Sequence, residues 1–276
     1  MTTNAVLNYG TNRNLNWQKP AVPLVRAPLV KPNFKLPTLP QLDQISNELL
    51  LSMPKETFSQ LQTEMRTVYF ERGQAIYDSG DPFDFVYFPN NLVASRLAIM
   101  EDGAMIEVGV VGREGLLGVA ALMGANAANN MTIAETSGSA IRVRTKVLRE
   151  LFRQNLKLQT LMLGYYHDFL TQVSQRAACR CRHSVAQQLC TWLLQIHDRA
   201  GTKDLTLTQE TIANRLGARR ASITVAINEL EKNNLLSCKR GHITICNRAG
   251  LENLACECYS LLCGNFENTF QSSFIQ

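Results

Sequence analysis

Between residues 67 and 118, short β-favouring runs alternate at regular intervals with clusters of turn residues. The Gly and Asn residues of these clusters supply the positive φ that tight hairpins require. Regular spacing of this kind predicts a small antiparallel barrel or sandwich, and residues 131–145 predict one more strand pair. The turn clusters are 71–73, 79–82, 89–91, 101–103 and 112–115.

From about Lys146 the apolar period becomes helical, with a short helix first and a long one from about Leu156 to Arg180. One stripe of the long helix is apolar, and it either packs on the barrel or pairs with a second subunit. A capping-box pattern at 184–187 predicts that a new helix starts after a break near His183. The apolar stripe consists of Leu158, Met162, Tyr165, Phe169 and Val173.

Residues 1–40 contain six of the nine prolines and show no apolar period. They cannot bury enough surface to offset the entropy of ordering, so we expect a disordered basic arm. Prolines and asparagines interrupt any signal-peptide core, and no apolar run approaches the roughly 18 residues that a membrane span needs. We therefore expect a soluble, cytoplasmic protein with no membrane partner.

Charge is distributed unevenly along the chain. Residues 176–250 hold twelve Lys or Arg and five acidic residues, whereas residues 43–175 hold eleven basic and fifteen acidic residues. A basic segment next to a mildly acidic one indicates an anionic partner for the basic part.

The basic segment contains two helices, a glycine turn and a hairpin, over residues 205–247. Thr208 is placed to cap the first helix and Gly217 to end it. A second helix with an apolar inner face follows, and then a hairpin that turns at residues 239–242. These are the parts of a winged helix-turn-helix, which lays its second helix in the major groove of DNA. The inner face of the second helix consists of Ile223, Ala226, Ile227 and Leu230.

Over about residues 41–260 the chain resembles CRP/FNR-family transcription regulators. The most specific stretch is LTQETIANRLGARRASITVAINELEKNNLL; VVGREGLLG and NRAGLENLACECY resemble a branch of the family that binds no nucleotide. The resemblance implies an α+β fold with an antiparallel, jelly-roll-like β-roll, a long dimerisation helix and a winged helix-turn-helix. It also implies a homodimer on an inverted-repeat DNA site, so we expect the apolar stripe to form the dimer contact. The predicted division is an arm (1–40), a β-roll sensor domain (41–154), the dimerisation helix and hinge (155–182), a DNA-binding domain (183–260) and a tail (261–276).

The resemblance also implies which residues meet DNA. Arg220 matches a base-reading arginine of the family, whereas Ala221 and Val225 stand where the family has a reading Glu and a second reading Arg. Arg220 is suited to guanine, Asn228 to adenine, and Ala221 or Val225 to a thymine methyl group, so the expected target differs from the family's commonest site. Thr224 completes the predicted base-reading set. The predicted phosphate contacts, which position without reading sequence, are Thr208, Arg219, Ser222, Lys239, Arg240 and His242.

Relatives that bind cyclic nucleotide hold the phosphate with an arginine. The matching position here falls near Asn130 and Met131, and a buried phosphate without a cation is strongly disfavoured. We therefore expect an effector other than cyclic AMP, with no cofactor. The predicted ligand pocket consists of Arg113, Glu114, Gly115 and Thr132.

All eight cysteines lie from Cys179 onward, and two pairs have a single intervening residue. Metal sites usually have a longer gap, so we expect no metal and interpret the cysteines as ordinary thiols, with a redox or iron–sulfur role as the alternative. The four histidines lie in no catalytic motif, so we expect no enzyme and no catalytic residues. The expected partners are double-stranded DNA, a second copy of the chain and RNA polymerase. The alternative is a ligand-sensing β-roll whose helix-turn-helix contacts protein rather than DNA.

Overall fold

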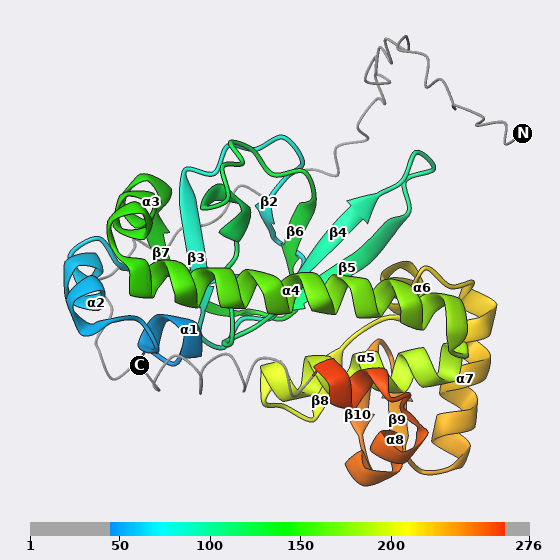
Figure 1. The fold of residues 1–276 in the computed structure, drawn as a ribbon. Coiled ribbons are helices and arrows are strands. Elements are labelled where there is room, and N and C mark those ends of the chain that lie inside the picture. Colours follow the sequence, from blue (N-terminus) through cyan, green and yellow to red (C-terminus); the bar gives the residue numbers. More distant parts are fainter. Residues whose placement is uncertain (1–44, 263–276) are drawn as a thin grey trace, which may run out of the picture.

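The computed structural model describes residues 45–262. A β-roll is crossed by one long helix, and a smaller domain of helices and a hairpin lies at one end of that helix (Figure 1). The architecture confirms the predicted α+β class, with an N-terminal antiparallel β-roll and a C-terminal winged helix-turn-helix. The predicted arm over 1–40 and all but the first two residues of the predicted tail lie outside the described residues.

The β-roll consists of two antiparallel sheets, with strand orders β1-β7-β3 and β2-β6-β4-β5. Both sheets contribute to one apolar cluster that includes Val68 of β1, Val111 of β5 and Ala140 of β7. Gly138 opens β7 because a Cβ there would lie 2.7 Å from the backbone of residues 91 and 92. The strands are β1 (Arg66–Phe70), β2 (Ala75–Tyr77), β3 (Phe85–Pro89), β4 (Ala94–Ile99), β5 (Met105–Val111), β6 (Met131–Ala134) and β7 (Gly138–Arg144).

Short helices close the ends of the roll. Asn47 caps the first of them by accepting a hydrogen bond from Leu50 N, and its side-chain amide donates to Pro89 O and Gly115 O. This fully buried side chain therefore ties the first helix to two loops of the roll. The short helices are α1 (Glu48–Leu51), α2 (Lys55–Gln62), the 3₁₀ turn η2 (Val119–Ala121) and α3 (Thr145–Gln154).

The long helix α4 (Leu156–Arg182) has 27 residues and passes along the whole roll (Figure 1). It ends at His183, whose backbone is extended, and α5 (Val185–Ala200) begins two residues later. Ser184 and Gln187 form both hydrogen bonds of a capping box at the start of α5. The predicted break and capping box are thus confirmed.

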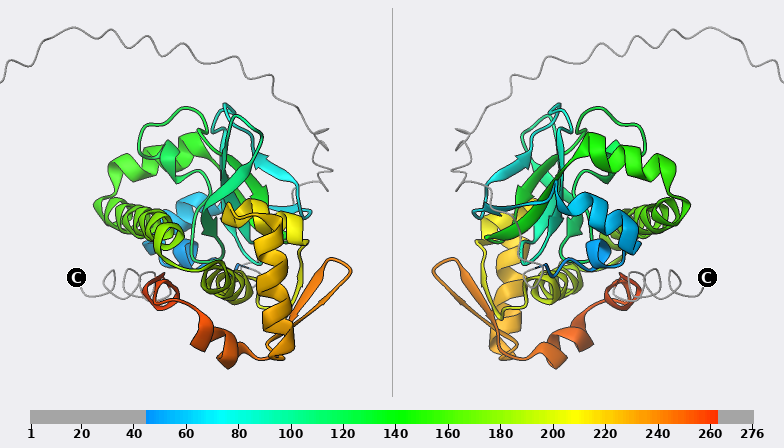
Figure 2. Two further views of the ribbon diagram at one scale, coloured as in Figure 1. Left: turned by 90° about the vertical axis from the view of Figure 1, so that its right-hand side faces the viewer. Right: turned by 90° about the vertical axis from the view of Figure 1, so that its left-hand side faces the viewer.

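The C-terminal domain has α6 (Gln209–Leu216), α7 (Arg220–Lys232), α8 (Arg248–Leu254) and a sheet of order β8-β10-β9. Gly217 ends α6 with φ of 62°, and Thr208 caps the same helix by accepting from Thr211 N, as predicted. The predicted inner face of α7 is buried. The wing hairpin projects from the body of the molecule (Figure 2) and turns at Arg240 and Gly241, both of positive φ. The strands of this sheet are β8 (Asp204–Thr206), β9 (Leu236–Lys239) and β10 (His242–Ile245).

Within residues 45–262, no helix combines the length and the apolar character that crossing a membrane would require.

Candidate DNA-binding surface and sensor cavity

The outer face of α7 carries the predicted base-reading residues. Arg220, Ala221, Val225 and Asn228 are all exposed. Val225 is 67% exposed, which leaves a branched apolar side chain in water on this face. Arg220 is the first residue of the helix, and its Nε lies 3.9 Å from a carboxylate oxygen of Glu210, with both side chains mostly exposed. The guanidinium is therefore only weakly held and can reach past the end of α7.

The hydroxyl residues of the predicted surface are less free. Thr224 is half-buried. Its hydroxyl lies within hydrogen-bond distance of two acceptors, Gln209 Oε1 at 2.8 Å and Arg220 O at 3.0 Å. Its hydroxyl thus ties α7 to α6. Thr208 is exposed but already caps α6, and Ser222 is half-buried. Of the predicted hydroxyl contacts, Thr208 alone is exposed.

The predicted phosphate-binding cations lie at two places on the same domain. Arg219 is the exposed N-cap of α7 and forms no side-chain cap. Lys239, Arg240 and His242 are exposed at the tip of the wing. Cations thus stand at the start of α7 and on the wing, the two parts of a winged helix-turn-helix that approach a DNA backbone.

The structure corrects the predicted dimer contact. The stripe expected to meet a second subunit packs on the β-roll of its own chain: Leu158, Met162, Tyr165 and Phe169 are buried, and Val173 packs against the same core. Packing on the barrel was the other interpretation of this stripe, and it is the one that the structure shows.

A different stripe of α4 is exposed. Leu156, Leu163 and Leu170 follow one another at seven-residue intervals and are 75%, 48% and 51% exposed, and exposed Ala177 continues the series. Apolar residues repeated every seven positions occupy one of the two seam positions of a coiled-coil heptad. The sequence also contains this repeat. The prediction chose the stripe of Leu158 to Val173 instead, because its apolar residues follow one another more closely.

A cavity lies between the β-roll and α4, lined by Tyr165 and Phe169 of the helix and by Thr132 and Asn130 of the roll. Arg96 of β4 also lines it, with Cζ 5.6 Å above the centre of the Phe169 ring. Burial lowers the pKa of Arg96 from its usual value. Gly109 makes room for the ring, because a Cβ there would lie 2.8 Å from Phe169. The result is a largely apolar cavity with one cation in its wall.

Of the four residues predicted to form a ligand pocket, Thr132 alone lines this cavity. Arg113 is exposed and pairs with Glu48 at 2.8 Å, and Glu114 accepts from Arg199 Nε at 2.7 Å and from Gly112 N. Gly115 lies against Tyr165, where a Cβ would be 2.6 Å from the hydroxyl oxygen. The sequence-based prediction missed Arg96, which β4–β6 pairing places directly opposite Thr132. A charged residue within an otherwise apolar strand was the available signal.

Three buried ion pairs join the β-roll to the helices that follow it. In each pair the roll supplies a glutamate and the helical part an arginine. Glu107 of β5 is fully buried and accepts from Arg176 of α4 and from Trp192 Nε1 of α5, the latter at 2.8 Å. The three pairs are Glu107–Arg176, Glu114–Arg199 and Glu135–Arg215.

These pairs share further contacts. The hydroxyl of Ser95 lies between the carboxylates of Glu107 and Glu135. Arg180 donates to Glu107 O at 2.6 Å and to Arg215 O at 2.7 Å. Since Arg215 belongs to α6, the network reaches from the roll into the helix-turn-helix itself and joins the C-terminal helical domain to the β-roll.

Two domain families match the chain. Residues 67–155 match the cyclic nucleotide-binding domain family, and residues 187–254 match the Crp-like helix-turn-helix domain family. The two matches together cover more than half of the chain and fall on the β-roll and on the helical domain.

Relatives match the chain over most of their own length. The chain is 23% identical over 185 residues to the global nitrogen regulator of Nostoc sp. PCC 7120, covering 64% of this chain and 83% of that protein. It is also 23% identical over 191 residues to the global nitrogen regulator of Synechococcus elongatus PCC 7942, covering 66% and 86%.

Solved structures show the same fold. The structure of FixK2 from Bradyrhizobium japonicum superposes with a TM-score of 0.60 at 17% identity, covering 70% of this chain and 98% of that one. A CRP/FNR-family transcriptional regulator from Thermus thermophilus superposes with a TM-score of 0.57 at 21% identity, covering 68% and 97%. With the β-roll, the winged helix-turn-helix and both domain matches in place, the chain belongs to the CRP/FNR family of DNA-binding transcription regulators.

Proposed function

We propose that the protein binds an inverted-repeat DNA site as a homodimer and regulates transcription in response to a small effector other than cyclic AMP. The observation that carries the proposal is the exposed row of Arg220, Ala221, Val225 and Asn228 on α7, with cations at both flanks. Such a row suits the major groove, which admits a helix, and the flanking cations suit the phosphates on either side.

The proposed dimer forms through the exposed leucines of α4. Pairing two copies of this helix buries Leu156, Leu163 and Leu170 against the same residues of the partner, as a two-fold interface requires. Two recognition helices then face one side of a duplex, with half-sites about one helical turn apart. RNA polymerase remains the proposed partner at promoters, and the cytoplasm the proposed location.

The base-reading roles make a direct prediction. Arg220→Ala and Asn228→Ala are each expected to cost roughly 1–3 kcal/mol of discrimination at one base pair per half-site, a loss of about 5- to 150-fold. The measurement is selection of bound duplexes from a random library at two salt concentrations, followed by affinities for the selected site and its single-base variants. An enriched inverted repeat is the expected product of the selection.

Matched variants separate reading from positioning. Lys239→Ala should weaken binding to every duplex by the same factor, because phosphate contacts carry no sequence information. It should also reduce the dependence of the DNA affinity on salt concentration. Asn233→Ala, at the exposed C-terminal end of α7, should change neither property. If no sequence is enriched and the variants behave like the wild type, the helix-turn-helix serves contacts with protein instead.

We further propose that the cavity beside α4 binds the effector and that Arg96 selects a small anion with an apolar body. The cavity walls are Tyr165, Phe169 and neighbouring apolar residues, and among the described residues its lining holds one cation, Arg96. An anion that reaches Arg96 gains a charge-assisted hydrogen bond inside a largely apolar site, where such bonds are strongest.

The cavity proposal is tested by thermal stability in the presence of small carboxylates and phosphates. A ligand at 100 times its dissociation constant stabilises the folded state by about 2.7 kcal/mol, so binding raises the melting temperature by several degrees. Arg96→Gln should abolish this rise, while Arg72→Gln, an exposed arginine elsewhere on the roll, should leave it intact. A rise of equal size in all three proteins would place the ligand elsewhere.

We propose that the predicted domain division describes how the protein works. The roll (41–154) senses, the helix and hinge (155–182) transmit, and the remainder to residue 260 binds DNA. An effector shifts an existing equilibrium between DNA-competent and incompetent arrangements about the break at His183. The buried ion pairs at Glu107, Glu114 and Glu135 supply contacts that can differ between the two arrangements.

A further inference from the structure

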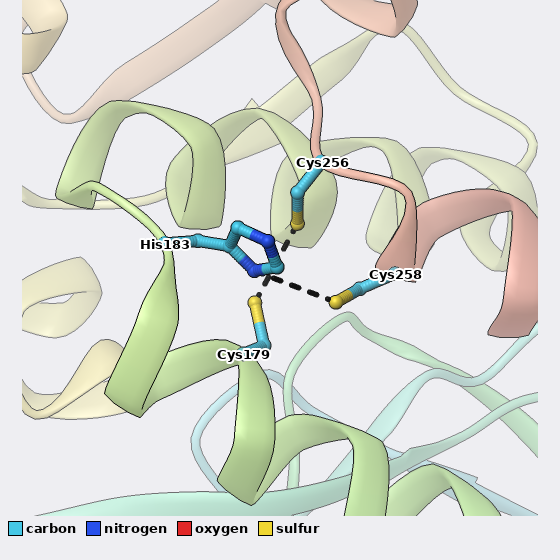
Figure 3. A group of neighbouring side chains, drawn as sticks. All are labelled: Cys179, His183, Cys256 and Cys258. Atoms are coloured by element: carbon cyan, nitrogen blue, oxygen red, sulfur yellow. Dashed lines mark hydrogen bonds between the residues drawn. The ribbon is translucent and has the colours of Figure 1, made fainter.

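Four potential metal ligands from two distant parts of the chain converge at the junction of α4 with the DNA-binding domain. Cys179 lies in the last turn of α4, and His183 is the residue that ends the helix. Cys256 and Cys258 follow α8. The four side chains point toward one another (Figure 3), and their sulfur and ring-nitrogen atoms all lie within 4.8 Å of one another.

We propose that Cys179, His183, Cys256 and Cys258 bind one Zn²⁺ ion. A tetrahedral zinc with Zn–S bonds of about 2.3 Å separates its ligand atoms by about 3.7 Å. Cys179 Sγ lies 3.6 Å from Cys256 Sγ, and Cys258 Sγ lies 3.6 Å from His183 Nδ1. Three thiolates and one imidazole are also a donor set that structural zinc sites use.

The surroundings of the four ligands have the features of a metal site's outer shell. Nε2 of His183, the ring nitrogen other than the one near Cys258, lies 3.2 Å from a carboxylate oxygen of Glu257. Such a contact fixes the ring orientation of a metal-bound histidine. Gln175 Nε2 donates to Cys258 Sγ at 3.1 Å, and the Thr191 hydroxyl lies 3.2 Å from Cys256 Sγ. Hydrogen-bond donors aimed at sulfur stabilise thiolate charge.

Burial and nearby charge also suit a structural ion. Cys179, Cys256 and Cys258 are buried, and the His183 side chain is 17% exposed. A pocket between α4 and α5 borders Cys179 and Cys258. The same pocket is lined by Arg176 and Arg180. Their positive charges offset the net negative charge of three thiolates around one divalent ion.

The two alternative uses of these cysteines fit less well. An iron–sulfur cluster divides its four protein ligands between two or more irons, which spaces them more widely than a single ion does. A disulfide between Cys179 and Cys256 leaves Cys258, His183 and the Glu257 contact without a role. The sequence-based expectation of no metal rested on the two cysteine pairs that have a single residue between them. In the structure, the neighbouring ligand of Cys179 is His183, one helical turn later. Cys181 is exposed and is not part of the group.

Zinc at this position would join the end of α4 to the segment after α8, which lies more than seventy residues later in the chain. The ion therefore cross-links the end of α4 to the segment after α8. This link restricts the angle between the long helix and the DNA-binding domain. This consequence for DNA binding rests on the proposed function, whereas the metal site itself does not.

The test is the metal content of the full-length chain, purified under reducing conditions without chelator and measured by mass spectrometry. One zinc per chain is expected. Cys258→Ser and His183→Ala should lose it, and Glu257→Gln should weaken zinc affinity about 10- to 100-fold. Cys181→Ser and Cys246→Ser, which replace exposed cysteines, should retain one zinc.

A second measurement does not depend on the folding of variants. Wild-type protein stripped of metal is titrated with Co²⁺, which should produce the intense visible absorption of tetrahedral thiolate coordination, and Zn²⁺ should displace it. Reduced protein that binds neither ion would overturn the proposal. Iron with acid-labile sulfide, or a zinc-free chain that carries a Cys179–Cys256 disulfide when it is purified without reductant, would replace it with a cluster or a redox switch. Duplex selection with Arg220→Ala is scored separately, so either proposal can fail alone.

Discussion

Replacing Glu107 with alanine is expected to destabilise the folded chain by about 3–5 kcal/mol. The carboxylate is fully buried and faces Arg176, which is 8% exposed, so its removal leaves a buried guanidinium without its counter-charge. Trp192 Nε1 and the Ser95 hydroxyl lose an acceptor in the same step. Urea unfolding followed by circular dichroism measures the loss directly.

Two comparisons make this result specific. Glu101→Ala removes an exposed glutamate from the β4–β5 hairpin and should change stability by less than about 0.5 kcal/mol. The double variant Glu107→Leu with Arg176→Met should be more stable than Glu107→Ala, because removing both charges leaves neither one buried alone. A Glu107→Ala variant as stable as the wild type would show that this network does not hold the two domains together.

Replacing Leu163 and Leu170 with alanine together is expected to convert the proposed dimer to a monomer. Both side chains are about half exposed in the single chain, so their burial in a dimer contributes about 1 kcal/mol each. A two-fold interface contains each position twice, and the loss of four such contributions weakens the dimer roughly 10³-fold. Sedimentation equilibrium at several protein concentrations measures this shift.

The same variant should lose affinity for an inverted repeat while still binding a single half-site weakly. Leu254→Ala, an exposed leucine on α8, is the matched control and should remain dimeric. If the double variant stays dimeric, a different surface joins the subunits, because the stripe of Leu158 and Met162 is already occupied by the β-roll.

Local signals made the helix-turn-helix predictable. The caps at Thr208 and Ser184, the glycine at Gly217 and the inner face of α7 each depend on residues within one or two turns of one another. The turn clusters of the roll were equally local. Features of this kind survive in a single sequence because nearby residues determine them.

Features that depend on the assembled fold could not be predicted in the same way. The long helix has two apolar stripes, and only the surface of the roll decides that Tyr165 faces inward while Leu163 faces out. Arg96 reaches the cavity because β4 pairs with β6. Cys256 meets Cys179 only after every intervening element has packed. Each of these contacts joins residues that are distant in sequence.

The buried ion pairs between the roll and the helices also limit how such a chain can diverge. Loss of a single glutamate or arginine is costly, whereas exchange of both members for apolar residues is close to neutral. Among related chains, Glu107 and Arg176 should therefore change together, and so should Glu135 and Arg215. In relatives that share less than a quarter of the sequence, this boundary between domains should differ by matched pairs rather than by isolated changes.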